Sequence, residues 1–148
     1  MSHKNYDPPM HTTEHILNRT MDNIFKCGRS IGTHLEKKKS KCDYPLNRDL
    51  TPEEKKLIEE TVNGVLDKNL EVKAIFLPPA EAAKLVDISK LPEGATDADI
   101  RIIQIGDYDN CACIGPHVAK TGDIKGRFKI TSTSLEQNGV CRVRWTCK

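Results

Sequence analysis

The stretch LTPEEKKLIEETVNGVL, residues 50–66, predicts the start and the buried face of a long helix. Thr51 can cap its N-terminus, Pro52 suits the first helical position, and Glu54 stands three residues after the cap, where its side chain can complete a capping box. Apolar residues then follow the spacing of one helix face: Leu57, Ile58, Val62, Val65 and Leu66. The sequence therefore predicts a helix that runs to about Asn69 and packs on a core.

A first helix is predicted upstream, beginning near Pro8 or Pro9 and stopping near Gly28. Its apolar positions are Ile16, Leu17, Met21, Ile24 and Phe25. Between the two helices the pattern predicts a strand, a lysine-rich turn and a short strand, over residues 30–36, 37–41 and 43–46.

Downstream, residues 70–77 alternate and predict a strand with Leu70, Val72, Ala74 and Phe76 on one face. The pattern further predicts a short helix (79–87), a loop (92–95), a clear strand (100–106), an irregular polar segment (107–126) and two terminal strands (127–134 and 140–147) that meet near Asn138-Gly139. This mixed order favours an α+β fold, in which a largely antiparallel sheet packs against a long helix and shorter helices.

The length of 148 residues fits a single domain. No apolar run approaches the roughly 18 residues of a membrane helix, and the N-terminus lacks the apolar segment of a secretory signal, so we expect a cytoplasmic protein without a membrane partner. In that compartment the six cysteines are expected to be reduced.

The pentapeptide HTTEH, residues 11–15, places two histidines four residues apart on the first predicted helix. Such side chains lie on one helix face, about one turn apart, so both imidazoles can reach one metal ion. The alternative is that His11 and His15 are solvent-facing and bind nothing.

A second pair, Cys113 and His117, also stands four residues apart, in a segment that contains Gly115 and Pro116. Together the two pairs offer three imidazoles and one thiolate, a set that zinc accepts in tetrahedral geometry. The alternative is a buried thiol and a hydrogen-bonded loop histidine. Cys111 could compete as a ligand, but we expect it on the opposite face of the segment. The remaining cysteines, Cys27, Cys42, Cys141 and Cys147, are expected in or near the core, His3 in a loose tail, and His34 in a structural or exposed position.

These motifs resemble the editing domain shared by threonyl- and alanyl-tRNA synthetases, the second additional domain, and the free-standing AlaX-type trans-editing proteins. The resemblance runs from about His11 to Arg144. HTTEH matches the family's His-x3-His, and CIGPH (113–117) its Cys-x3-His in a form similar to the threonyl type. Segments that look more like the alanyl type are VAKTGDI (118–124), FKI (128–130) and Gly139-Val140 before Arg142.

The resemblance implies an editing-type domain over residues 11–148, after an N-terminal tail of residues 1–10. It also implies an aminoacyl-tRNA deacylase that hydrolyses the ester of mischarged tRNA, such as seryl- or glycyl-tRNA, in trans. His11, His15, Cys113 and His117 are the expected catalytic and metal-binding residues, with Zn²⁺ as the cofactor and the aminoacyl-tRNA acceptor end as the partner.

Two alternatives stay open. The family commonly has an acidic residue two positions before the motif cysteine, where this chain has Cys111, so the domain could be a non-catalytic zinc- or tRNA-binding remnant. A purely structural zinc domain is a weaker possibility. Basic residues that could contact RNA phosphates cluster twice: Lys37, Lys38, Lys39 and Lys41, then Lys125, Arg127, Lys129, Arg142, Arg144 and Lys148.

Overall fold

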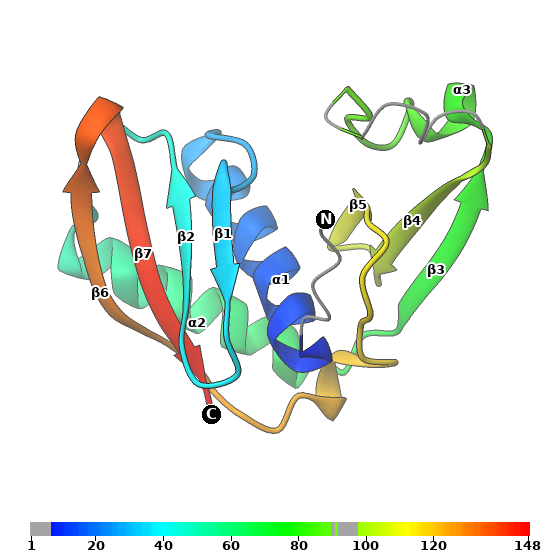
Figure 1. The fold of residues 1–148 in the computed structure, drawn as a ribbon. Coiled ribbons are helices and arrows are strands. Elements are labelled where there is room, and N and C mark those ends of the chain that lie inside the picture. Colours follow the sequence, from blue (N-terminus) through cyan, green and yellow to red (C-terminus); the bar gives the residue numbers. More distant parts are fainter. Residues whose placement is uncertain (1–6, 90, 92–97) are drawn as a thin grey trace.

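The computed structural model of the chain describes residues 7–89, 91 and 98–148. His3 and the expected loop at 92–95 lie outside these residues. Figure 1 shows the helices and strands in chain order. The described elements are α1 (Pro8–Phe25), β1 (Gly32–Leu35), β2 (Ser40–Tyr44), α2 (Pro52–Asp67), β3 (Val72–Leu77), α3 (Pro79–Ala82), β4 (Ile100–Ile105), β5 (Asp109–Ala112), β6 (Phe128–Glu136) and β7 (Val140–Cys147), with short 3-10 turns at Thr121–Asp123 and Gln137–Gly139.

The described strands form two sheets in which every pairing is antiparallel. The first has the order β1-β2-β7-β6 and the second the order β3-β4-β5. Figure 1 shows α1 between the two sheets, and α2 packs against α1 and β6. The predicted α+β class is confirmed, although the strands are divided between two sheets rather than joined in one.

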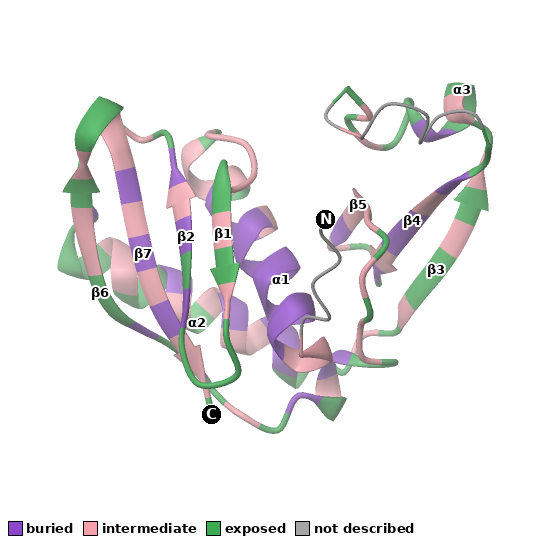
Figure 2. Ribbon diagram, in the orientation of Figure 1, coloured by how far each residue is buried: buried purple, intermediate pink, exposed green. Residues whose placement is uncertain are grey.

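The core lies where α1 and α2 cover one face of the four-stranded sheet. Residues of β2 and β7 alternate between buried and more exposed positions, as Figure 2 shows, because successive side chains of a strand point to opposite faces. The buried side includes Cys42, Tyr44, Val143 and Trp145. The other face carries polar and basic side chains, among them Lys41, Arg142 and Arg144.

The helices begin where the sequence predicts. Thr51 and Glu54 form the expected capping box at the start of α2. The first helix begins at Pro8, within the range assigned to the tail. It ends at Phe25, three residues before Gly28, and Lys26 after it takes a left-handed conformation.

Several predictions of local structure were wrong. The strand β2 occupies residues 40–44 rather than 43–46, because Lys41 alternates with buried Ser40 and Cys42 and so continues the sheet. The helix α3 ends at Ala82 instead of residue 87. The segment 107–126 is not wholly irregular, since it contains β5, whose polar sequence DNCA carries no strand pattern.

The predicted face of β3 was also wrong. Phe76 is 61% exposed and Ala74 is exposed, whereas Ile75 packs against a small second cluster of Ala82, Ile100 and Ile102. This cluster under α3, and not the main core, determines which side of β3 is covered. None of the described helices is both long enough and apolar enough to cross a membrane.

Candidate metal centre

The N-terminal half of α1 delivers two imidazoles into the interior of the protein. His11 is 5% exposed and His15 is 3% exposed, and their ring centroids lie 5.0 Å apart. The helix places them one turn apart on the face that looks toward β5 and the segment after it. Both imidazoles are buried, whereas the alternative interpretation requires them to face the solvent.

The segment that follows β5 brings the thiol and the third imidazole to the same place. Arg101 on β4 donates hydrogen bonds from Nη1 to the carbonyl oxygens of Cys113 (2.9 Å) and Gly115 (3.0 Å), which fixes the course of the segment. Gly115 lies against the ring of His11, and a Cβ atom there would stand 2.4 Å from its Cε1 atom. The close approach therefore depends on a residue without a side chain.

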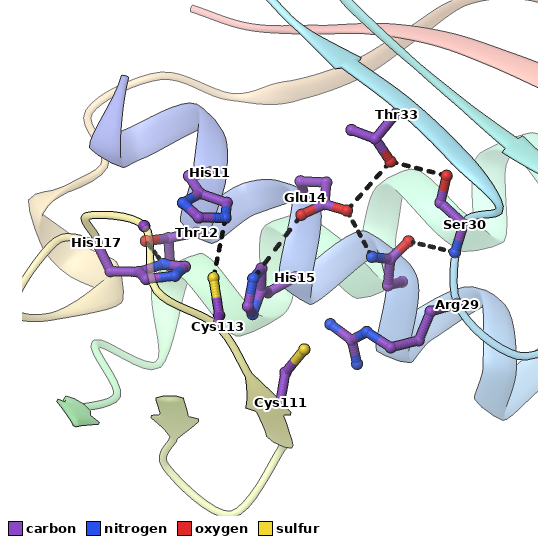
Figure 3. Close-up of polar contacts among 12 residues, drawn as sticks. His11, Thr12, Glu14, His15, Arg29, Ser30, Thr33, Cys111, Cys113 and His117 are labelled. Carbon is purple, nitrogen blue, oxygen red and sulfur yellow. Dashed lines mark hydrogen bonds and ion pairs between the residues drawn. The ribbon is translucent and has the colours of Figure 1, made fainter. Parts of the chain in front are cut away.

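The four residues converge on one point, as Figure 3 shows. One ligand atom from each of His11, His15, Cys113 and His117 lies within 4.8 Å of all the others. Nε2 of His11 lies 3.3 Å from Sγ of Cys113, and the rings of His11 and His117 stack with centroids 4.2 Å apart. Two segments about a hundred residues apart thus form a single cluster.

The hydrogen bonds around the imidazoles suit a metal ion. Nδ1 of His11 lies 3.1 Å from the carbonyl oxygen of Pro116, which can only accept, so Nδ1 carries the proton and Nε2 the lone pair. Nδ1 of His117 lies 2.9 Å from Oγ1 of Thr12, while its Nε2 is buried and has no hydrogen-bond partner among the described residues. Metal-binding histidines characteristically have one nitrogen held by an outer group in this way.

The size of the cluster also fits zinc. Three nitrogens at about 2.0–2.1 Å and one sulfur at about 2.3 Å from a tetrahedral zinc ion stand roughly 3.3–3.6 Å from one another. The pair of His11 and Cys113 already has this separation, and the longest separation of 4.8 Å needs adjustments of only about 1 Å. Three imidazoles and one thiolate are a donor set that zinc accepts.

The electrostatics favour a thiolate at the centre. Burial raises the pKa of Cys113, but its close polar contacts with the imidazoles of His11, His117 and His15 outweigh burial and lower the pKa to about 3. Burial lowers the pKa of His15, yet its interactions with Asp109 and Cys113 raise it overall to about 9. The pKa of His117 is lowered, mainly by burial.

Asp109 on β5 forms a long ion pair with the second nitrogen of His15. Its Oδ2 lies 3.6 Å from Nδ1 of His15, and its carboxylate accepts hydrogen bonds from Arg19 (3.0 Å) and Arg29 (2.8 and 3.1 Å). Burial raises the pKa of Asp109, but His15 and Arg29 outweigh that effect and hold it below its usual range. The carboxylate thus ties α1, the segment after it and β5 together beside the centre.

A cavity of about 490 Å³ opens next to the centre and shares His15 with it. Glu14, Arg29, Cys111 and Leu85 are among the residues that line it. The prediction for Cys111 was wrong, because residues two apart along an extended segment share a face, and Cys111 and Cys113 both point toward α1 (Figure 3). Cys111 is nevertheless absent from the four-residue cluster, and burial raises its pKa to about 12.

The other cysteines and His34 lie where the sequence predicts. Cys42 and Cys141 are buried, Cys27 and Cys147 pack at the edge of the core, and all six thiols are free. His34 is exposed, with its Nε2 2.7 Å from Oε2 of Glu36.

Four residues that support the centre could not be recognised from the sequence. Thr12, Asp109, Arg101 and Arg29 matter through their contacts with the ligands or with the segments that carry them, and those contacts depend on the packing of β5 against α1. Only Thr12 lies inside one of the motifs, HTTEH, and a threonine at that position does not by itself predict the contact with His117.

The sequence family described as the threonyl and alanyl tRNA synthetase second additional domain matches residues 100–144. That range includes Cys113 and His117. The chain is 33% identical over 141 residues to an alanine–tRNA ligase of Ignicoccus hospitalis, a match that covers 91% of this chain.

The chain belongs to this family.

Further relatives of this second additional domain are alanine–tRNA ligases of Rickettsia massiliae, 32% identical over 144 residues, and of Treponema denticola, 29% identical over 149 residues. These matches cover 93% and 96% of the chain. The chain spans only 15% of the Ignicoccus protein, 16% of the Rickettsia protein and 24% of the Treponema protein.

Proposed function

We propose that residues 11–148 form a second additional domain that hydrolyses the ester of mischarged aminoacyl-tRNA, with seryl- or glycyl-tRNA as substrate. The domain acts in trans, in the cytoplasm. The observation that carries the proposal is the convergence of His11, His15, Cys113 and His117 beside an open cavity. A buried cluster with a neighbouring cavity offers both the reactive groups and the space for an acceptor end.

The side chains of the centre supply what ester hydrolysis requires. The three imidazoles and the thiolate would hold zinc, which would polarise the ester carbonyl or lower the pKa of a water molecule by accepting that group as a fifth ligand. His15 borders both the cluster and the cavity, so it lies closest to the ester of an acceptor end in that cavity. Asp109 keeps its ring oriented through the contact at Nδ1.

The partner would dock its phosphates on the open face of the four-stranded sheet. Lys41 pairs across the sheet with Arg144, and both line a groove of about 330 Å³ with His34, Lys39 and Thr131. Lys39 and Lys41 form no ion pair with any described residue, whereas Arg144 pairs with Glu136 at 3.8 Å. Arg127 and Arg142 are paired with Asp67 and Asp43. Lys39 and Lys41 of the first basic segment and Arg144 of the second therefore share one groove that suits an RNA backbone.

A deacylation assay tests the proposal. Seryl-tRNA and glycyl-tRNA are incubated with the zinc-supplied chain, with the His11→Ala variant, and with correctly charged alanyl- and threonyl-tRNA as controls. Hydrolysis of a mischarged tRNA that His11→Ala abolishes is expected. No hydrolysis above background on any mischarged tRNA, with zinc present, would contradict the proposal.

Cys111 favours a second candidate, a non-catalytic zinc- or tRNA-binding remnant of the same domain. Its thiol faces the cavity at the position where the resemblance implies an acid, and its raised pKa keeps it neutral near pH 7. This candidate predicts zinc and tRNA binding without turnover. A gain of hydrolysis in Cys111→Asp, starting from an inactive chain, would support it.

A further inference from the structure

Glu14 is a buried carboxylate whose Oε2 is hydrogen-bonded and whose Oε1 has a long ion-pair contact with His15. Oε2 accepts hydrogen bonds from Nδ2 of Asn18 at 2.7 Å and from Oγ1 of Thr33 at 3.3 Å. The nearest contact of Oε1 given by the structure is Nε2 of His15, at 3.9 Å, which is beyond hydrogen-bond distance (Figure 3). The side chain is held at one end, with Oε1 left for another partner.

No lysine or arginine among the described residues forms an ion pair with Glu14. Arg29 interacts electrostatically with Glu14, but its guanidinium donates its hydrogen bonds to both oxygens of Asp109. Asp109 is thus neutralised from two sides, and Glu14, with a side chain only 12% exposed, is not. Buried carboxylates are normally paired, and the cation beside Glu14 is His15 at 3.9 Å. A histidine must be neutral to bind a metal ion, so zinc at the centre would leave this carboxylate without a cationic partner.

The cavity that Glu14 lines has an excess of acids. Its charged lining residues are three carboxylates and two guanidinium groups, which give a net charge of −1 with histidine neutral: Glu14, Asp22 and Asp87 against Arg19 and Arg29. A cationic group is therefore favoured over an anionic one inside this cavity. His15 lies in the same lining and belongs to the metal centre.

We propose that Glu14 is the subsite for the α-ammonium group of the aminoacyl substrate. The inference rests on the proposed function, because an aminoacyl ester carries its positive charge one carbon from the carbonyl that is attacked. A carboxylate beside His15 would bind that ammonium through Oε1 and place the ester next to the metal centre. It would also reject acyl groups without an amino group.

The test uses two probes that cannot be hydrolysed. The first probe is adenosine in which an NH group replaces the 3′-oxygen and carries a seryl group through an amide bond. The second is the same compound with a hydroxyl in place of the α-amino group of the seryl group. Binding of each to the zinc-supplied full chain is measured by calorimetry for the wild type, Glu14→Gln and Asp22→Asn. In Glu14→Gln the amide oxygen can still accept from Asn18 and Thr33, so the fold is expected to persist, with zinc content as the check.

We expect the wild type to bind the amine probe about tenfold or more tightly than the hydroxyl probe, the size of a lost charged hydrogen bond. Glu14→Gln should abolish this preference and Asp22→Asn should keep it. Equal binding of the probes by the wild type, no binding of either, or a preference that survives in Glu14→Gln would overturn the assignment. An equal loss of the preference in Asp22→Asn would also overturn it, because the net charge of the cavity would then explain the result. The same holds if Glu14→Gln loses zinc and binds both probes equally weakly, because Glu14 would then act through His15.

The result is independent of turnover. A chain that prefers the amine probe through Glu14 but hydrolyses no mischarged tRNA would contradict the proposed deacylase and leave the ammonium subsite in place. A chain that hydrolyses seryl-tRNA equally well with Glu14→Gln, without a preference between the probes, would do the reverse.

Discussion

Gly115 shows how a single residue without a side chain shapes the centre. The ring of His11 occupies the space in which a Cβ atom would stand, at 2.4 Å from Cε1 and 2.8 Å from Nδ1. That ring is in turn stacked on His117 and lies against Cys113, so it has little freedom to move aside. The identity of this residue therefore bears directly on where a ligand nitrogen lies.

The variant Gly115→Ala is expected to lower zinc affinity by about 10- to 100-fold, because the ring of His11 must shift. Competition with a coloured chelator measures the affinity. Gly64→Ala is the matched control: nothing lies within 4 Å of the added methyl group, and alanine is the better residue inside α2, so zinc affinity should be unchanged and the melting temperature slightly higher. Unchanged zinc affinity in Gly115→Ala would argue against the metal centre.

At the scale of elements, α2 depends on a charged start. Glu54 accepts a hydrogen bond from the backbone N–H of Thr51 and pairs with Arg48, with oxygen–nitrogen distances of 2.8 and 2.7 Å. The hydrogen bonds from Arg48, despite a small opposing effect of desolvation, lower the pKa of Glu54 to about 2. The carboxylate thus stabilises the folded state in its charged form.

Glu54→Gln is expected to cost about 0.5 kcal/mol of unfolding free energy at pH 7, since glutamine keeps the capping bond but loses the charge pair. The folded pKa is depressed, so the stabilisation is present above the unfolded pKa of about 4.3 and is lost as the pH falls toward 2. Urea unfolding at pH 6, 4 and 3 should show the difference between wild type and variant shrinking. A difference that grows in acid would contradict this account.

Some elements could be predicted from the sequence and others could not, for physical reasons. The helices α1 and α2 have proline or a capping box at their starts and a buried face at helical spacing, and both signals are local. The strands β2 and β5 are short and polar, and they exist because neighbouring strands hydrogen-bond them. The exposed position of Phe76 likewise follows from what covers β3, which no local pattern encodes.

The candidate site shows the same division. His11, His15, Cys113 and His117 were visible because their chemistry and spacing are unusual. Glu14 and Asp109 were not singled out, because a carboxylate in sequence carries no sign of whether a guanidinium will reach it. Cys111 was misplaced because its position was judged without the alternation of an extended chain.

At the scale of the whole molecule, the centre joins parts that otherwise pack separately. Two ligands lie on α1, within the main core, and two follow β5 of the three-stranded sheet, part of which packs in its own small cluster with α3. A bound ion would therefore hold the second sheet against the first helix.

Chelation is expected to release the segment after β5 and leave the main core folded. Hydrogen–deuterium exchange should rise around residues 109–118 after treatment with a chelator, while α2 and β7 stay protected, and deacylation should stop before any loss of helix content. Global unfolding on chelation would instead indicate a purely structural zinc domain.

The basic groove of the four-stranded sheet leads to a prediction about salt. Lys41→Glu is expected to weaken tRNA binding and to reduce the slope of log K against log salt by about 1, since one phosphate contact is lost. Filter binding at several salt concentrations measures both. Lys68→Glu, an exposed charge at the end of α2, is the control and should change neither. Equal effects of the two substitutions would remove the groove from the binding surface.

The buried face of α1 both fills the core and supplies ligands to the centre. Of its 18 positions 11 are buried, and His11 and His15 are among them. A slip of one position would turn both rings by about 100° and expose apolar groups at once. A change of specificity would therefore have to leave this helix unaltered and modify the rim of the cavity, at a position such as Leu85, whose exposed side chain can change without disturbing the interior.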